Sequence, residues 1–441
     1  MRRVAVIGSG ISGLSVAHAL SGTAHVTLFE AADYFGGHTH TVDVEVSTPD
    51  GRIKHPVDTG FLVFNERTYP QLIRLFDDLK VETTTSDMSF SVKVPNVDLE
   101  WSGSSLGTLF AQRRNLVRPA FLKMLSDLLR FNRLCCELAQ ADAEAQPELQ
   151  VSIADFLTEH RFSRSFIDWY FLPMIGCIWS CPTQQMLQFP ILTMIRFCYN
   201  HGLLQVSNRP KWYTVVGGAK QYVAKMLTSI PDARLNAPVR SVMRANPGAI
   251  NAGVTVSTDH GSERFDDVVM ACHSDQTVSL LHNADAEERA VLGAIRYHRN
   301  RAVLHTDISV LPKRPKVWAA WNYERASNIG QEQNAVCLHY LINKLQPLPF
   351  RVPVIVSLNP VHEPSPDSIQ GVYDYAHPVF DAAAIGAQKK LPEIQGNGHV
   401  WFCGAWTRYG FHEDGLMSGL DVVQRLKSQW THSASTIQEA A

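Results

Sequence analysis

The sequence has no long hydrophobic run, no excess of one charge and no cysteine pattern typical of a metal site. None of its apolar stretches approaches the ~20 uninterrupted residues that a membrane-spanning helix needs. Its 40 basic and 42 acidic residues give a formal net charge of −2, so no overall field attracts nucleic acid. We therefore expect neither a transmembrane helix nor a nucleic-acid partner.

The cysteines are scattered and lie mostly in apolar runs. Cys177 and Cys181 are close in sequence and Cys135 and Cys136 are adjacent, but no second pair completes a structural zinc pattern. The first ten residues, MRRVAVIGSG, lead directly into an expected strand and leave no room for a signal peptide. We expect no metal site and a reducing, cytoplasmic setting.

A dinucleotide-binding pattern opens a chain that, at 441 residues, is long enough for two or three domains. Residues 4–7 are a short β-branched run typical of a buried strand, and a Gly-x-Gly-x-x-Gly loop and a helical stretch follow. The first glycine allows a tight turn, the second lets a pyrophosphate approach the backbone, and the third allows close helix packing. The loop residues that we assign to the cofactor are Gly8, Gly10, Ser12 and Gly13.

A second apolar run, residues 25–29, ends at Glu30. An acid at this place accepts hydrogen bonds from a ribose diol, and it repels the 2′-phosphate of NADP. Residues 30–39, EAADYFGGHT, resemble the second flavin signature of the superfamily of amine oxidases, protoporphyrinogen oxidases and phytoene desaturases. The resemblance implies FAD as the cofactor. It assigns FAD contacts to Glu30, Gly36, Gly37, His38 and Thr39, with His38 where the family usually has an arginine.

Further segments resemble the same superfamily and span the chain. Residues 57–61 resemble the stretch near the flavin ring, 212–222 the Gly-Gly segment that leads back to the cofactor domain, and 237–239 a strand beside the adenine. Residues 400–419 resemble the last cofactor motif, in which a strand ends at a glycine and a helix begins under the flavin. Such a helix N-terminus stabilises negative charge on the reduced ring. The resemblance assigns to FAD Asp58, Thr59, Gly60, Phe61, Val239, Gly404, Glu413, Asp414, Gly415 and Leu416.

These motifs predict an α/β fold. A Rossmann-like FAD-binding domain is assembled from discontinuous segments, and an inserted α+β substrate domain contains a helical subdomain. We expect residues 1–85, 211–280 and 395–432 in the FAD-binding domain and residues 86–210 and 281–394 in the substrate domain. The last helix is expected to end near Trp430, with a flexible tail at 433–441.

Residues 106–138 carry apolar side chains at helical spacing, with a break at Pro119. The interleaved basic residues are Arg113, Arg114, Arg118, Lys123, Arg130 and Arg133. The pattern is typical of an amphipathic helical pair with a solvated basic face. It also fits peripheral contact with anionic lipid at the inner face of a membrane. Both readings stay open.

Residues 169–198 are dense in Phe, Leu, Ile, Met, Trp and Tyr. Such a run is most often core, and if it lines a cavity the ligand is large and lipophilic. Lys316 and Lys344 lie in the region where many superfamily members place a lysine near flavin N5, but a surface position is commoner for both. Of the 18 histidines only His412 lies in the flavin-ring motif, and it is our candidate catalytic residue for acid–base transfer.

The sequence GGHTHTVDVE and the segments near residues 57 and 411 are most similar to a bacterial group described as predicted NAD/FAD-binding or amine oxidase-like proteins. Its members often occur beside cyclopropane fatty acid synthase-like methyltransferases. We expect an FAD-dependent oxidoreductase that oxidises, desaturates or isomerises a lipophilic substrate, an unsaturated or modified fatty acyl lipid, by hydride transfer to N5. Two alternatives stay open: an amine oxidase, and a non-catalytic flavoprotein partner of a lipid-modifying enzyme. The electron acceptor, the oligomeric state and a covalent flavin link, at Cys403 or His38, also stay open.

Overall fold

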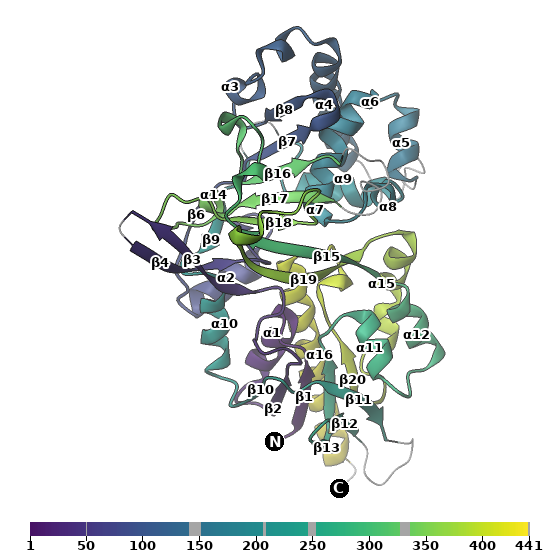
Figure 1. Ribbon diagram of the computed structural model, residues 1–441. Helices are drawn as coiled ribbons and strands as arrows, with labels where there is room; N and C mark the ends of the chain where they lie inside the picture. Colours follow the sequence, from purple (N-terminus) through teal and green to yellow (C-terminus); the bar gives the residue numbers. More distant parts are fainter. Residues whose placement is uncertain (50, 141–150, 206–208, 246–252, 327–335, 440–441) are drawn as a thin grey trace.

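The computed structural model describes residues 1–49, 51–140, 151–205, 209–245, 253–326 and 336–439. Figure 1 shows two large sheets, one in the half that carries both chain ends and one in the half that carries most of the helices. The two halves meet where β19 (Ile369–Val379) and β15 (Arg296–His305) cross the molecule.

A five-stranded parallel sheet forms the centre of the first half, in the order β10-β2-β1-β14-β20. Its inner strands are short apolar runs buried on both faces, as expected of parallel strands covered on both sides. Their bounds are β1 (Arg3–Ile7), β2 (His25–Phe29), β10 (Asp232–Arg234), β14 (Asp267–Met270) and β20 (Val400–Phe402). The strands come from all three segments predicted to bind FAD. The predicted Rossmann-like fold is confirmed, and the domain boundaries stay a prediction.

Different elements cover the two faces of this sheet. Four helices share one hydrophobic cluster with it: α1 (Ile11–Leu20), α2 (Pro70–Asp78), α10 (Lys220–Leu227) and α16 (His412–Glu439). The other face packs on the antiparallel sheet of β11 (Val239–Arg244), β12 (Val254–Thr258) and β13 (Gly261–Phe265), with α12 (Ala286–Gly293) and α15 (Ala382–Ile394); α11 (Ser274–Leu280) lies beside α12. Helices α12 and α15 therefore pack on the cofactor side, although they lie inside the segment predicted for the substrate domain.

The last helix is longer than predicted. It runs to Glu439 instead of ending near Trp430, so the backbone of most of the predicted tail is helical. No glycine or proline follows Trp430, and the segment contains Ala, Gln and Glu, which favour helix.

The second half is built on a seven-stranded sheet in the order β19-β15-β18-β17-β16-β7-β8, mostly antiparallel. Its other strands are β7 (Phe90–Val94), β8 (Leu99–Ser102), β16 (Trp321–Glu324), β17 (Cys337–Leu341) and β18 (Ile355–Leu358). Helices of the insert pack against it: α4 (Pro119–Gln140), α5 (Ile153–Glu159), α6 (Arg164–Phe166), the π-helix η5 (Ile167–Phe171), α7 (Leu172–Trp179), α8 (Thr183–Leu187) and α9 (Ile191–Asn200). Within the apolar run at residues 169–198, Met186 and Met194 are fully buried in this core.

Short elements connect these layers. They are the hairpin β3 (Thr41–Thr48) and β4 (Gly51–Asp58), the sheet of β5 (Phe64–Asn65), β6 (Thr83–Ser86) and β9 (Trp212–Val215), and the helices α3 (Leu106–Leu109) and α14 (Ile342–Leu345). Pro119 begins α4 instead of interrupting a helix, because the first helical residue needs no N–H donor. Among the described helices, none is long and apolar enough to cross a membrane.

Candidate cofactor and substrate site

The glycine loop between β1 and α1 has the geometry of a phosphate cradle. Gly8 has φ +100°, and a Cβ on Gly13 would lie 1.9 Å from the Gly8 carbonyl oxygen. A Cβ on Gly10, by contrast, would meet nothing within 4 Å. No side chain of the described residues caps the N-terminus of α1, so its first N–H groups are available to an anion. The loop fits the pyrophosphate of a dinucleotide.

Glu30 braces this loop from the end of β2. Its carboxylate accepts hydrogen bonds from the Ser9 amide (2.9 Å), the Ser9 hydroxyl (2.5 Å) and the Ala32 amide (2.9 Å). The Ser9 hydroxyl in turn accepts a hydrogen bond from the Gly36 amide at 3.1 Å. A carboxylate offers about four acceptor sites, so a ribose contact remains compatible with these bonds. Ser9 was missed because it stands at a variable position of the glycine motif.

The second flavin signature packs directly on the first. Gly37 has φ +58°, and a Cβ there would lie 3.1 Å from the Gly10 Cα. A Cβ on Gly60 would lie 2.1 Å from the His38 carbonyl oxygen, which also accepts a hydrogen bond from the Phe61 amide at 2.7 Å. The structure therefore brings three predicted cofactor segments, around residues 10, 37 and 60, into contact.

Asp58 joins four segments from a fully buried position. Its carboxylate accepts hydrogen bonds from the Thr41 hydroxyl, the Ala219 amide (3.0 Å) and the Gln346 side-chain amide (2.6 Å). Burial raises the pKa of Asp58 to about 6, and these donors oppose the rise. The side chain is thus occupied by protein donors, and its predicted contact with FAD stays a prediction.

A buried hydrogen-bond chain links the second signature to the last cofactor motif. The Tyr222 hydroxyl lies 2.5 Å from Thr39 Oγ1 and 2.7 Å from His412 Nε2. The His412 ring stacks on Phe61, with 3.8 Å between ring centroids and 12° between planes. Tyr222 is completely buried, and sequence reasoning missed its role because it lies 190 positions from His412.

The neighbouring Thr59 is held in the same way by β19. Its hydroxyl lies 2.6 Å from the Tyr375 hydroxyl and donates to the His40 carbonyl at 3.1 Å. Both Thr59 and Tyr375 are buried. Tyr375 was not identified from the sequence, because nothing in its strand pattern distinguishes it from a core tyrosine.

Four half-buried histidines from distant segments gather beside these loops. The His38 ring lies 5.3 Å from His377 and 6.1 Å from His273. Burial lowers the pKa of His38 and His273 to about 4 and of His377 and His412 to about 3, and repulsion between rings adds to the effect for His38, His377 and His412. All four rings are neutral at pH 7. Each keeps part of its surface accessible, as side chains that face a ligand do.

His38 differs from the arginine that the family usually has at this place. It donates a hydrogen bond to the Ala376 carbonyl, whereas its buried Nε2 has no partner among the described residues. The donating nitrogen must therefore be Nδ1, which leaves the lone pair on Nε2. A buried acceptor without a partner fits a hydroxyl or N–H group of FAD, and it cannot supply the charge of an arginine.

The acids of the last motif bind helix ends. The Glu413 carboxylate accepts the amides of Gln71 (2.8 Å) and Leu72 (2.9 Å) at the start of α2. Asp414 accepts the Phe411 amide at 3.0 Å, and burial raises its pKa to about 6. Both side chains therefore cap helix N-termini, and contact with FAD stays a prediction for them.

Other assigned residues of the motif set the packing of α16 on α1. A Cβ on Gly415 would lie 2.8 Å from Ile11 and 3.0 Å from Ser12, so only glycine permits this approach. Leu416 is buried in the hydrophobic cluster that α16 shares with α1, α2 and α10. The Gly404 amide donates a hydrogen bond to the Ser418 hydroxyl at 2.9 Å. Val239 is buried at the start of β11.

Phe411, next to His412, points to the substrate side. Its ring stacks on Phe197 of α9, with 4.8 Å between centroids, and His201 stacks on Phe197 from 4.0 Å. Trp179 lies 4.9 Å from the same ring. Burial lowers the pKa of His201 to about 4, so this aromatic cluster is uncharged at neutral pH.

The remaining candidates lie away from these loops. Lys344 forms a surface ion pair with Asp87 at 3.1 Å, and Lys316 is exposed. Trp401 and Trp406 belong to different hydrophobic clusters, so the two rings do not form a cage. Cys403 is fully buried, and burial raises the pKa of its thiol.

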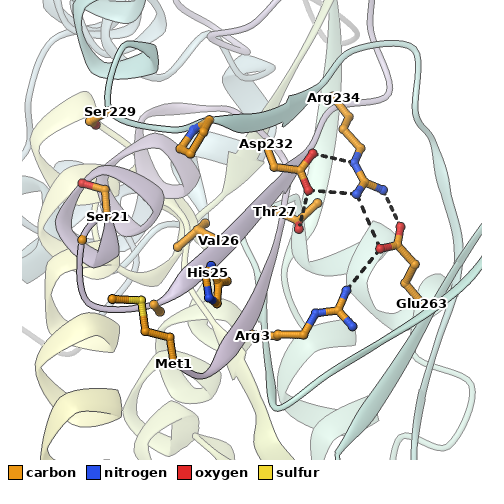
Figure 2. A pocket seen from close by; sticks show the side chains of 13 residues that line it. Met1, Arg3, Ser21, His25, Val26, Thr27, Ser229, Asp232, Arg234 and Glu263 are labelled. Atoms are coloured by element: carbon orange, nitrogen blue, oxygen red, sulfur yellow. Dashed lines mark hydrogen bonds and ion pairs between the residues drawn. The ribbon is translucent and has the colours of Figure 1, made fainter.

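Two further features of the molecule lack the chemistry of a cofactor or metal site. Glu324, Cys337 and His339 place ligand atoms within 4.8 Å of one another, but Lys93 lies 3.0 Å from Glu324, and an ammonium at that distance disfavours a cation. The prediction of no metal site stays a prediction. Figure 2 shows a surface pocket of about 430 Å³ whose charged residues, Arg234 among them, are paired with one another. It adjoins the starts of β1 and β2, whereas dinucleotides bind at the carboxyl ends of such strands.

Comparison with known proteins agrees with the geometry. The family model described as flavin containing amine oxidoreductase matches residues 11–296. No curated protein matches the sequence. Two similar solved structures are a CLA-producing fatty acid isomerase from P. acnes, 13% identical with a TM-score of 0.65 over 96% of this chain and 98% of that chain, and the cyclohexylamine oxidase from Brevibacterium oxydans IH-35A, 17% identical with a TM-score of 0.66 over 97% and 99%. At these identities the likeness is one of fold.

Proposed function

Because the chain belongs to the flavin containing amine oxidoreductase family and is an FAD-dependent oxidoreductase, we propose that its substrate is an unsaturated or modified fatty acyl lipid. The observation that carries the proposal is the uncharged aromatic cluster of Phe197, His201 and Phe411 beside the residues assigned to the flavin ring. Phe411 and His412 are consecutive, and they join this cluster to the Phe61 loop. We expect a substrate that approaches the flavin from the helical side to meet this aromatic cluster.

An amine substrate fits this arrangement less well. A protonated amine is a cation and needs acceptors or carboxylates for orientation. The acids nearest in sequence, Glu413 and Asp414, are bound to backbone amides at helix ends. The charged group that acts on His201 is the cation Arg67, which would repel a protonated amine. An apolar acyl chain needs none of these groups.

Bound FAD supplies the hydride acceptor of the reaction. The residues of the chain would hold and orient it: the N-terminus of α1 would bind the pyrophosphate, Glu30 the ribose, and the rings of Phe61 and His412 the flavin. We assign His412 a positioning role. A histidine with a pKa of about 3 stays neutral at physiological pH and is a poor proton acceptor, so stacking and its hydrogen bond to Tyr222 are its contributions.

The test is an anaerobic titration of the purified protein, after its released chromophore has been identified as FAD by mass. Phospholipids with unsaturated, methyl-branched or cyclopropane acyl chains and a panel of amines are added in turn, and the visible flavin band is followed. Product lipids are also analysed for double-bond position, because isomerisation leaves the flavin oxidised. Lipid conversion without amine conversion supports the proposal. Bleaching by amines alone would assign the chain to amine oxidation.

A matched pair of variants locates the substrate path. Phe197→Leu keeps most of the side-chain volume but removes the ring that Phe411 and His201 stack on. We expect a raised KM for lipid with unchanged FAD affinity. The control Phe131→Leu alters a buried ring of the same hydrophobic core that packs on Phe162 and Phe166, and it should leave KM unchanged.

We also propose that the enzyme works in the cytoplasm, at the membrane that contains such lipids.

A further inference from the structure

The exposed apolar side chains of the molecule are concentrated at one end. Eleven large apolar side chains are exposed among the residues that the structure describes, and six of them lie between residues 97 and 129. They are Val97, Leu106, Leu116, Val117, Leu122 and Leu129. Val117 and Leu106 are 78% and 76% exposed, which is unusual for side chains of this size. Packing within the chain does not account for them.

These six residues lie in the turn at 95–97, in α3, at 116–117 and in α4, at the end of the molecule remote from the chain ends, where Figure 1 shows α3 and α4. Arg118 donates to the Val97 carbonyl at 3.3 Å and Arg114 pairs with Asp98 at 2.7 Å, so the turn at 95–98 lies against the start of α4. Leu122 and Leu129 lie two turns apart on the outer side of α4. Together they form one surface, which we call the tip surface.

Basic side chains outnumber acidic ones on the tip surface, where the exposed Asp98 beside Val97 is paired with Arg114. Residues 113–136 contain six basic side chains and a single acid, Asp127. Asp127 is completely buried and is paired with Lys123 at 2.8 Å and Arg130 at 3.1 Å. Arg113 and Arg133 are exposed. Lys313 and Lys316 are also exposed, on a segment that contacts α3. The exposed leucines are therefore flanked mainly by cations, with Asp98 as an exposed acid in the turn at 95–98.

We propose that the tip surface docks on an anionic lipid membrane. Apolar side chains of this kind enter the boundary between head groups and acyl chains, and Lys and Arg beside them bind the phosphates. The absence of exposed acids between residues 113 and 136 of the described chain favours a negatively charged partner. The apolar residues add a term that a purely electrostatic partner such as nucleic acid does not use. This inference deepens the proposed membrane location and otherwise shares only the lipid class with the proposed function.

Figure 1 shows α3 and α4 beside β8, an edge strand of the seven-stranded sheet, with α5 to α9 along one side of that sheet. The tip surface is therefore at the end of the substrate half that is remote from the chain ends. An acyl lipid would then reach the flavin through the helical subdomain, without crossing the cofactor domain.

The experiment is sedimentation of the FAD-loaded protein with vesicles of phosphatidylglycerol and phosphatidylcholine, without substrate or turnover. We expect binding to phosphatidylglycerol that falls as salt rises, and weak binding to pure phosphatidylcholine. The double variant Arg113→Ser/Arg133→Ser should lower the partition coefficient by roughly tenfold or more. The double variant Leu116→Ser/Val117→Ser should also lower it, and should leave a weaker, more salt-sensitive binding.

The matched charge control is Arg52→Ser/Arg240→Ser, which removes the same charge from two exposed ion pairs elsewhere. The apolar control is Met243→Ser on β11, 49% exposed. Both controls should bind like the wild type, and all variants should keep FAD and Tm, since the changed side chains are exposed. A wild type that ignores phosphatidylglycerol at low salt, or controls that lose binding equally, would overturn the proposal. So would a dimer in ultracentrifugation that the tip variants dissociate, because the surface would then belong to a second copy. Vesicle binding and lipid conversion are measured separately, so either can fail alone.

Discussion

Removal of one oxygen atom, by Tyr222→Phe, tests the hydrogen-bond chain that joins the cofactor motifs. The phenylalanine ring fits the same buried place, 5.3 Å from Phe76. What disappears is the hydroxyl between Thr39 Oγ1, at 2.5 Å, and His412 Nε2, at 2.7 Å. Thr39 is buried and His412 is half-buried, so neither regains full hydration.

The magnitude follows from the partners left behind. A buried polar group that loses its partner costs about 1–3 kcal/mol, so two such groups should lower the free energy of unfolding by about 2–6 kcal/mol. The stack on Phe61 still holds one face of the His412 ring, but nothing fixes its rotation. Thr39 is an assigned cofactor contact, and we expect FAD affinity to fall by at least tenfold, which corresponds to about 1.4 kcal/mol.

The assay is twofold: urea unfolding of the apo-protein, and FAD titration followed by quenching of flavin fluorescence. Tyr69→Phe is the control, since this buried tyrosine packs on the same side of the cofactor domain and its hydroxyl makes no hydrogen bond to the part of the chain that the structure describes. If the free energy of unfolding of Tyr222→Phe lies within about 0.5 kcal/mol of the wild-type value and the variant binds FAD equally well, the Thr39–Tyr222–His412 hydrogen bonds do not position the site.

Three further changes test separate parts of the site. Gly37→Ala places a Cβ 3.1 Å from the Gly10 Cα and should weaken FAD binding by tenfold or more, whereas Gly22→Ala, at a similar positive φ with nothing within 4 Å, should leave the Kd for FAD unchanged. Glu413→Gln turns an amide N–H toward a backbone donor and should lower stability by about 1–2 kcal/mol in urea unfolding. His377 has a pKa of about 3 in the folded protein against 6.5 in the unfolded chain. The stability contributed by its neutral ring is therefore complete above pH 6.5 and declines as pH falls toward 3. His377→Asn should therefore remove about 2 kcal/mol of the loss of stability between pH 8 and pH 5, and an unchanged pH slope would contradict a neutral buried ring.

The parts of the fold that the sequence predicted are those set by local pattern. The strand, glycine loop, helix and second strand follow one another within thirty residues, and each is visible in its own spacing. The conformation of Gly8 and the contact of Gly13 with Gly8 follow from residues only five apart. The same reasoning placed Glu30 correctly at the end of β2.

The parts that escaped prediction depend on contacts between distant segments. Tyr222 becomes a site residue only because α10 and α16 pack on the same face of the sheet, and no spacing in the sequence records that. Resemblance located Asp58 and Glu413 in the right neighbourhood, but it did not show which way their side chains point. Both carboxylates accept hydrogen bonds from backbone amides of the protein. The positions of helix starts such as that of α2 decide which acids are occupied in this way, and those positions depend on the tertiary fold.

The histidine at position 38 changes what can hold the pyrophosphate. An arginine supplies a full positive charge, whereas the imidazole rings of His38 and His377 are neutral at pH 7. The positive potential then comes from the N-terminus of α1, about half an elementary charge, together with its N–H groups. A substitution His38→Arg would not restore the family's contact. The guanidinium would need a buried place beside His377 and His273, without a carboxylate among the partners that the structure gives His38, and burial of an unpaired charge costs several kcal/mol. We therefore propose that the histidine and the neutral rings around it form one unit, which would bind FAD by backbone donors and shape more than by ion pairing.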